Sequence, residues 1–142
     1  MIPQLWTSYW SCPILRRTDA VKVSISRGVP RWPLPFQYRR AMLLAPSKQT
    51  FALKSDEAFE AAYLAELKEA GVDKIGDLLR RFSEEAGRRP VVLLCWEKPG
   101  TGPCHRWQFA SWWFERTGQE VPELGRGCGP SHKRQDLQSP LF

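Results

Sequence analysis

The chain has 142 residues, of which 42 % are hydrophobic, and this is enough for one domain with a buried core. It contains no apolar run near the roughly 20 residues that span a bilayer, and its start, MIPQLWTSYW, lacks the basic flank and apolar core of a signal peptide, so we expect a cytoplasmic protein without a membrane segment. The net charge is +6, with seven Lys or Arg and one acid in residues 1–40, which favours an anionic small molecule or nucleic acid as partner.

The N-terminal part of the sequence predicts two strands and a long loop. Residues 3–10 read as a strand, and so do residues 20–26, AVKVSIS, in which apolar and polar residues alternate. Four prolines and a glycine in residues 27–46 exclude a regular element across most of that segment. The aromatic residues of this loop, Trp32, Phe36 and Tyr38, favour a loop that packs against the domain.

Two helices are expected in the middle of the chain. Residues 56–70 and 73–86 carry apolar side chains at helical spacing, and each segment is followed by a glycine that can end a helix. Asp56 and Asp73 are the predicted N-caps. We interpret both apolar stripes as faces of the core.

The C-terminal part predicts a buried strand, a third helix and a tail. The unbroken apolar run VVLLCW, residues 91–96, is typical of a central strand buried on both faces. Residues 104–118 read as a helix, and a short last strand at residues 119–124 is placed beside the central one. Together the elements indicate one small α/β domain with a mostly parallel central sheet flanked by helices, at residues 1–124, followed by a mobile tail at residues 125–142.

The segment between the central strand and the third helix predicts an anion site. A glycine-rich turn, KPGTGP, leads into the N-terminus of a helix, where free backbone N–H groups and the helix dipole attract negative charge. In a parallel sheet this turn lies at the carboxyl end of a strand, the edge where the SISRG strand also ends. We therefore expect Ser26, Arg27, Cys95, Glu97 and His105 to converge on one cleft. The residues predicted to bind the anion are Ser26, Arg27, Gly100, Gly102 and Arg106.

Three residues of the same segment could carry chemistry: Glu97, Cys104 and His105. Cys104 lies in the first turn of the helix, where the dipole is expected to lower the pKa of its thiol, but a buried thiol that fills space is the alternative. Glu97 could act as an acid or a base, or form a structural ion pair with Arg106. The cysteines and histidines lack the paired spacing of a zinc site, so no metal is predicted, and four cysteines favour reduced thiols over a disulfide scaffold.

Three sequence motifs resemble the Domain of Unknown Function 488 family: SISRGVPRW at 24–32, LLAP at 43–46 and VVLLCWEKPGTGPCHRWQFASWW at 91–113. The resemblance spans roughly residues 3–124. It implies a small α/β domain and no particular reaction, because the family has no established activity. The positions that the family marks fall on Ser26, Arg27, Pro30, Cys95, Glu97, Cys104, His105 and Arg106.

Two classes of function follow from these observations. The first is an enzyme that acts on a nucleotide or another phosphorylated small molecule at the strand–turn–helix site. The alternative is a noncatalytic module that binds nucleic acid or protein through the basic N-terminal third. The sequence identifies neither a cofactor nor an oligomeric state.

Overall fold

The computed structural model describes residues 2–96 and 105–124, which form an α/β domain around a parallel sheet. The sheet contains β1 (Leu5–Tyr9), β2 (Val21–Ser24), β3 (Arg39–Arg40) and β4 (Val91–Cys95). The four strands are all parallel and lie in the order β1-β4-β2-β3. The predicted fold class is confirmed, and so is the position of the apolar run 91–95 as a central strand, because every residue of β4 is buried between β1 and β2.

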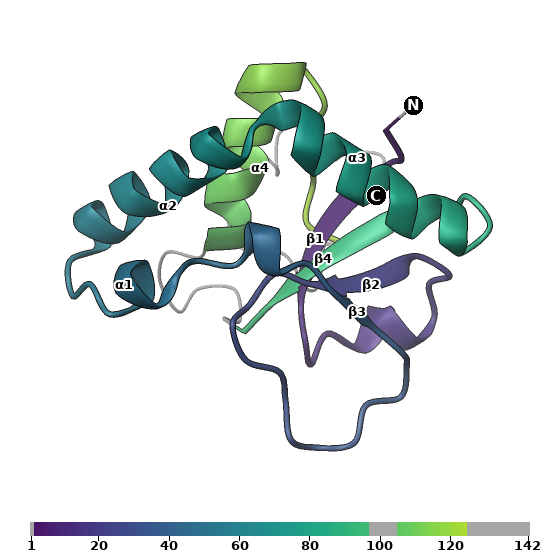
Figure 1. The fold of residues 1–142 in the computed structure, drawn as a ribbon. Coiled ribbons are helices and arrows are strands. Elements are labelled where there is room, and N and C mark those ends of the chain that lie inside the picture. The colour runs from purple at the N-terminus through teal and green to yellow at the C-terminus, as the bar shows by residue number, and fades with distance from the viewer. Residues whose placement is uncertain (1, 97–104, 125–142) are drawn as a thin grey trace.

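The two faces of the sheet are covered differently. Three helices cover one face, α2 (Asp56–Ala70), α3 (Val72–Glu85) and α4 (His105–Thr117), as Figure 1 shows. The other face packs against a short 3₁₀ helix at Pro13–Arg16 and against side chains of the loop between β2 and β3. Alternate residues of β4 enter the two cores, which places the Cys95 side chain on the face that the helices cover.

Several local predictions differ from the structure. Ser55, not Asp56, caps α2, because its hydroxyl oxygen accepts a hydrogen bond from the Ala58 backbone N–H. No side chain caps α3, which begins directly after Gly71. Four short elements were not expected: the 3₁₀ helix at Pro13–Arg16, β3, a 3₁₀ helix at Met42–Leu44, and α1 (Lys48–Phe51).

The segment at residues 119–124 was predicted beside the wrong strand. Glu123 forms an isolated parallel bridge with Thr7 of β1 and lies beside that strand, not beside β4. The Thr7 N–H donates to the Pro122 carbonyl at 2.9 Å, and the Leu124 N–H donates to the Thr7 carbonyl at 2.7 Å. Because β1 and β2 already occupy both edges of β4, the segment that follows α4 pairs with the outer edge of β1.

The expectation of reduced thiols is wrong for one cysteine. Cys12 is disulfide-bonded, whereas the Cys95 thiol is buried. The predicted tail at residues 125–142 also lies outside the described part of the chain. Among the described helices, none has the length and apolar character that crossing a membrane requires.

Candidate functional site

A thiol and an imidazole meet at the carboxyl edge of the sheet. Cys95 is the last residue of β4, and His105 is the first residue of α4. The Sγ atom of Cys95 lies 3.6 Å from Nδ1 of His105, within hydrogen-bonding distance for sulfur. On the other side of the ring, Nε2 lies 2.7 Å from the carbonyl oxygen of Ile25, the residue that follows β2. Two neighbouring parallel strands and a helix thus hold this pair.

The contact with Ile25 determines which ring nitrogen of His105 carries the proton. A carbonyl oxygen only accepts hydrogen bonds, so Nε2 must be the donor. In the neutral ring, Nδ1 is then the acceptor, and it lies close enough to the Cys95 thiol to accept its proton. A cysteine nucleophile is activated by a neighbouring base that a third group orients. Here the thiol is Cys95, the base is His105 and the orienting group is the Ile25 carbonyl.

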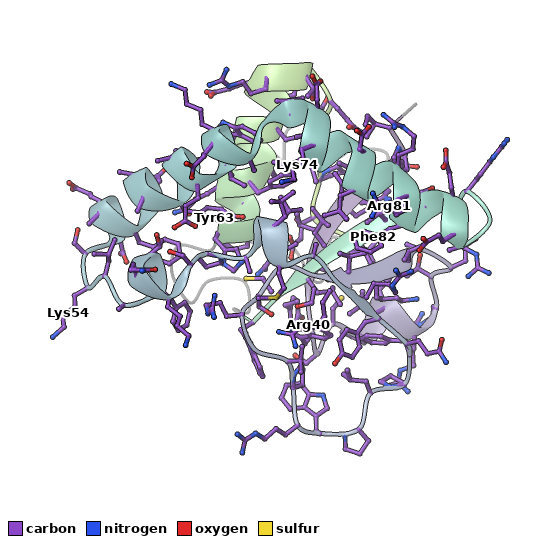
Figure 2. The ribbon with its side chains drawn as sticks, viewed as in Figure 1. Arg40, Lys54, Tyr63, Lys74, Arg81 and Phe82 are labelled. Atoms are coloured by element: carbon purple, nitrogen blue, oxygen red, sulfur yellow. The ribbon has the colours of Figure 1, made fainter. Side chains whose placement is uncertain are left out.

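Aromatic side chains from α2 fix the ring of His105 in this orientation. The Tyr63 ring contacts it edge-on, with ring centroids 5.3 Å apart and planes at 80°, and Phe59 lies at 6.4 Å. Tyr63 lies on the side of α2 that is turned towards the sheet (Figure 2), and its hydroxyl donates to the Leu44 carbonyl at 2.7 Å. His105 is therefore held by packing as well as by hydrogen bonds.

Ser26 lies in the turn that follows β2, next to the residue that binds His105. Its hydroxyl donates to the Gly28 carbonyl at 2.7 Å and accepts a longer bond from the Trp10 indole N–H at 3.4 Å. The side chain is buried, and these bonds shape the turn. The structure thus brings Cys95 and His105 of the predicted cleft together, whereas the Ser26 side chain contacts Trp10 of the other core.

Arg27 points towards a second cluster of polar groups. Its guanidinium donates to the Pro46 carbonyl at 3.2 Å, and its charge acts on the carboxylate of Glu66 in α2. Glu66 accepts hydrogen bonds from the Ser47 backbone N–H at 3.0 Å, from the Ser47 hydroxyl at 2.6 Å and from the Thr50 hydroxyl. Burial opposes ionisation of Glu66, but these hydrogen bonds outweigh it and hold the pKa of the carboxyl below its ordinary value.

Arg106 is committed to a buried ion pair. Its Nε and one terminal nitrogen donate to the two carboxylate oxygens of Glu123 at 3.2 and 3.0 Å, and its side chain has no exposed surface. Glu123 also accepts from the Thr7 hydroxyl at 2.6 Å and from the Trp107 indole N–H at 2.9 Å. The pairing of Arg106 with Glu97 stays a prediction, and so does a role in anion binding, which this ion pair disfavours.

The sequence had not singled out Glu123. It is one acid in a segment without a periodic pattern, so the sequence contains no local signal for its burial. Four of the predicted site residues, Glu97, Gly100, Gly102 and Cys104, lie outside the described residues, and their roles stay predictions. Within the described residues, no group of three or more His, Cys, Asp or Glu side chains could hold a metal ion.

Comparison of the chain with protein-family models, curated proteins and solved structures gives no match. The resemblance to the Domain of Unknown Function 488 family therefore stays a prediction.

Proposed function

We propose that the chain is an enzyme that acts on a nucleotide or another phosphorylated small molecule, with Cys95 and His105 as its reacting groups. The observation that carries the proposal is the contact of 3.6 Å between the Cys95 thiol and Nδ1 of an imidazole whose Nε2 is held by the Ile25 carbonyl. Such an arrangement is needed for nucleophilic or general acid–base catalysis, and a core packed for stability alone does not require it.

The chemistry available to the pair is a proton transfer. The thiol proton of Cys95 moves to Nδ1 of His105, which leaves a thiolate and an imidazolium, while Nε2 keeps its proton and donates it to the Ile25 carbonyl. The thiolate is a nucleophile, and the imidazolium can return its proton to a leaving group. Glu97 and Cys104, predicted from the sequence to take part, are close in the chain to Cys95 and His105.

Two features support an anionic substrate. The pair lies at the carboxyl edge of a parallel sheet, the edge at which open α/β sheets bind their ligands. The chain also has an excess of basic residues before residue 41. A phosphate group has the charge that this edge would attract.

The test is a turnover assay on a panel of nucleoside mono-, di- and triphosphates and sugar phosphates, with products identified by mass spectrometry. We expect Cys95→Ser and His105→Asn to lower turnover by roughly 10²- to 10⁴-fold. His132→Asn, which changes the only other histidine of the chain, should keep the parent rate. Circular dichroism and thermal unfolding establish that each variant is folded.

Two results would contradict the proposal. One is a parent protein that neither converts nor saturably binds any member of the panel. The other is full turnover by a folded Cys95→Ser or His105→Asn protein. The alternative class of function, a noncatalytic module that binds nucleic acid or protein, would use the basic N-terminal third and would not require Cys95 or His105.

A further inference from the structure

An open groove lies on the face of the sheet that the helices leave uncovered. It has a volume of about 520 Å³ and is formed by one stretch of the loop between β2 and β3. Figure 1 shows this loop extending away from the side of the sheet that α2 and α3 occupy. The residues that line the groove are Pro30, Trp32, Leu34, Phe36, Gln37 and Tyr38.

The aromatic residues of the groove are anchored in the core. The indole of Trp10, which is buried, stacks on the Phe36 ring with planes at 9° and contacts Tyr38 edge-on at a centroid distance of 5.1 Å. This part of the loop therefore packs as the sequence predicts. A loop with three proline bends and packed rings is pre-organised, so a ligand would order little of it on binding.

Two exposed indoles contact each other beside the first part of the loop: Trp32 of the loop and Trp96, which directly follows β4. The Trp32 side chain has an exposed fraction of 47 %, that of Trp96 is 42 %, and their ring centroids lie 5.7 Å apart with planes at 82°. The Trp96 indole N–H donates to the Gly28 carbonyl at 3.1 Å, which fixes that ring. Two large apolar rings held in place at the surface offer faces on which planar groups can stack.

Two arginines near these rings, Arg31 and Arg40, form no salt bridge within the described part of the chain. Arg31 is exposed beside Trp32. The guanidinium of Arg40 donates to the Arg27 carbonyl at 2.7 Å, and Figure 2 shows Arg40 on the side of the sheet away from α2 and α3. The Lys22 ammonium lies 5.6 Å from the Phe36 ring centroid.

We infer that this groove binds a single-stranded nucleic acid, with bases stacked on Trp32 and Trp96 and phosphates on Arg31 and Arg40. Exposed aromatic rings interleaved with arginines are the recurring chemistry of single-strand binding, because each base has a face that can stack and each nucleotide carries a phosphate. The groove is wide open to solvent, whereas small-molecule sites usually enclose most of their ligand. The basic excess disfavours a cationic peptide, and paired bases would have no free face to stack on Trp32.

The test uses a fluorescent oligothymidylate and an oligouridylate of about 12 nucleotides, a length within the usual site size for single-strand binders. Binding is measured by anisotropy at several salt concentrations. Trp32→Ala should weaken binding by roughly 5- to 150-fold, the effect of losing one stacked base. Arg31→Ala and Arg40→Ala should each reduce the slope of log affinity against log salt by about 0.7.

Matched controls change residues of the same type elsewhere. Phe51→Ala removes an exposed aromatic ring from α1, and Arg81→Ala removes an exposed arginine from α3, so both should bind as the parent does. Trp32 is itself exposed, and its substitution should leave the fold intact.

Three results would overturn the inference: parent affinity in Trp32→Ala, equal weakening in the control variants, or a duplex or acidic peptide that binds as tightly as the oligonucleotide. This inference is independent of the proposed enzyme. Cys95→Ser and His105→Asn should bind the oligonucleotide as the parent does, so either proposal can fail while the other stands.

Discussion

Removing the Glu123 carboxylate should strongly destabilise the domain. Glu123 accepts hydrogen bonds from Thr7, Trp107 and two nitrogens of Arg106, and the exposed side-chain fractions of Arg106 and Glu123 are 0 % and 2 %. In Glu123→Ala, the Arg106 guanidinium keeps its charge in the interior and loses this counter-ion. Removing one member of a buried pair costs about 3 to 5 kcal/mol, a large share of the ~5 to 15 kcal/mol that stabilises a typical domain.

The consequence extends to the candidate site, because Arg106 directly follows His105 at the start of α4. Urea denaturation, followed by circular dichroism and tryptophan fluorescence, gives the free energy of unfolding for the parent and the variant. For a domain of this size, the expected loss corresponds to a decrease in Tm of about 10 to 20 °C.

An exposed ion pair in the same chain provides the control. Arg80 and Asp77 are 2.7 Å apart with side chains 36 % and 63 % exposed, so Asp77→Ala should cost no more than about 1 kcal/mol. The double variant Arg106→Met/Glu123→Leu should regain most of the stability that Glu123→Ala loses, because no buried charge remains. If Glu123→Ala costs as little as Asp77→Ala, the reasoning is refuted, and Arg106 is accessible enough to serve as an anion ligand.

Two further predictions concern α2. Hydrogen bonds from Ser47 and Thr50 lower the pKa of Glu66 in the folded state. Its carboxylate therefore stabilises the fold at pH values above the unfolded pKa near 4.5, and this stability is lost as the pH falls through the lower folded pKa. Glu66→Gln should therefore have a lower free energy of unfolding than the parent at pH 7, and this difference should shrink as the pH falls. If the difference in unfolding free energy is the same at pH 7 and pH 3, the prediction is wrong. Gly71 has φ of 90°, so Gly71→Ala should cost about 1 to 3 kcal/mol in urea denaturation, whereas Gly28→Ala, whose added Cβ would lie 3.9 Å from its nearest neighbour, should cost far less. Equal costs for the two substitutions would refute the strain argument.

The elements with strong local patterns were predicted from the sequence. The run at residues 91–95 is apolar throughout because both of its faces are buried, and the helical stripe of α3 marks a face packed on the core. β3 was missed because it consists of two exposed arginines, which show no alternation. The last segment was placed beside the wrong strand because strand order depends on which sheet edge remains open, and this is decided only when the whole sheet has formed.

The candidate site was predicted in part for similar reasons. Ser26, Cys95 and His105 were all expected at one edge because parallel strands end there, and the structure brings Cys95 and His105 into contact while the Ser26 side chain contacts Trp10. The partner of Arg106 depends on where the segment after α4 returns, so Glu123 was not foreseen. The sequence also did not separate Trp32, which is exposed, from aromatic residues of the same loop that pack against Trp10.

The most direct test of the central claim is a measurement of the ring ¹⁵N chemical shifts of His105 by NMR, in the parent and in Cys95→Ala. We predict a neutral ring with its proton on Nε2 and a bare Nδ1, whose shift changes when the Cys95 thiol is removed and again when a phosphorylated substrate binds, while His132 shows neither change. A neutral ring with its proton on Nδ1, or an Nδ1 shift that responds to neither the substitution nor a bound substrate, would contradict the assignment of Cys95 and His105 as the reacting pair.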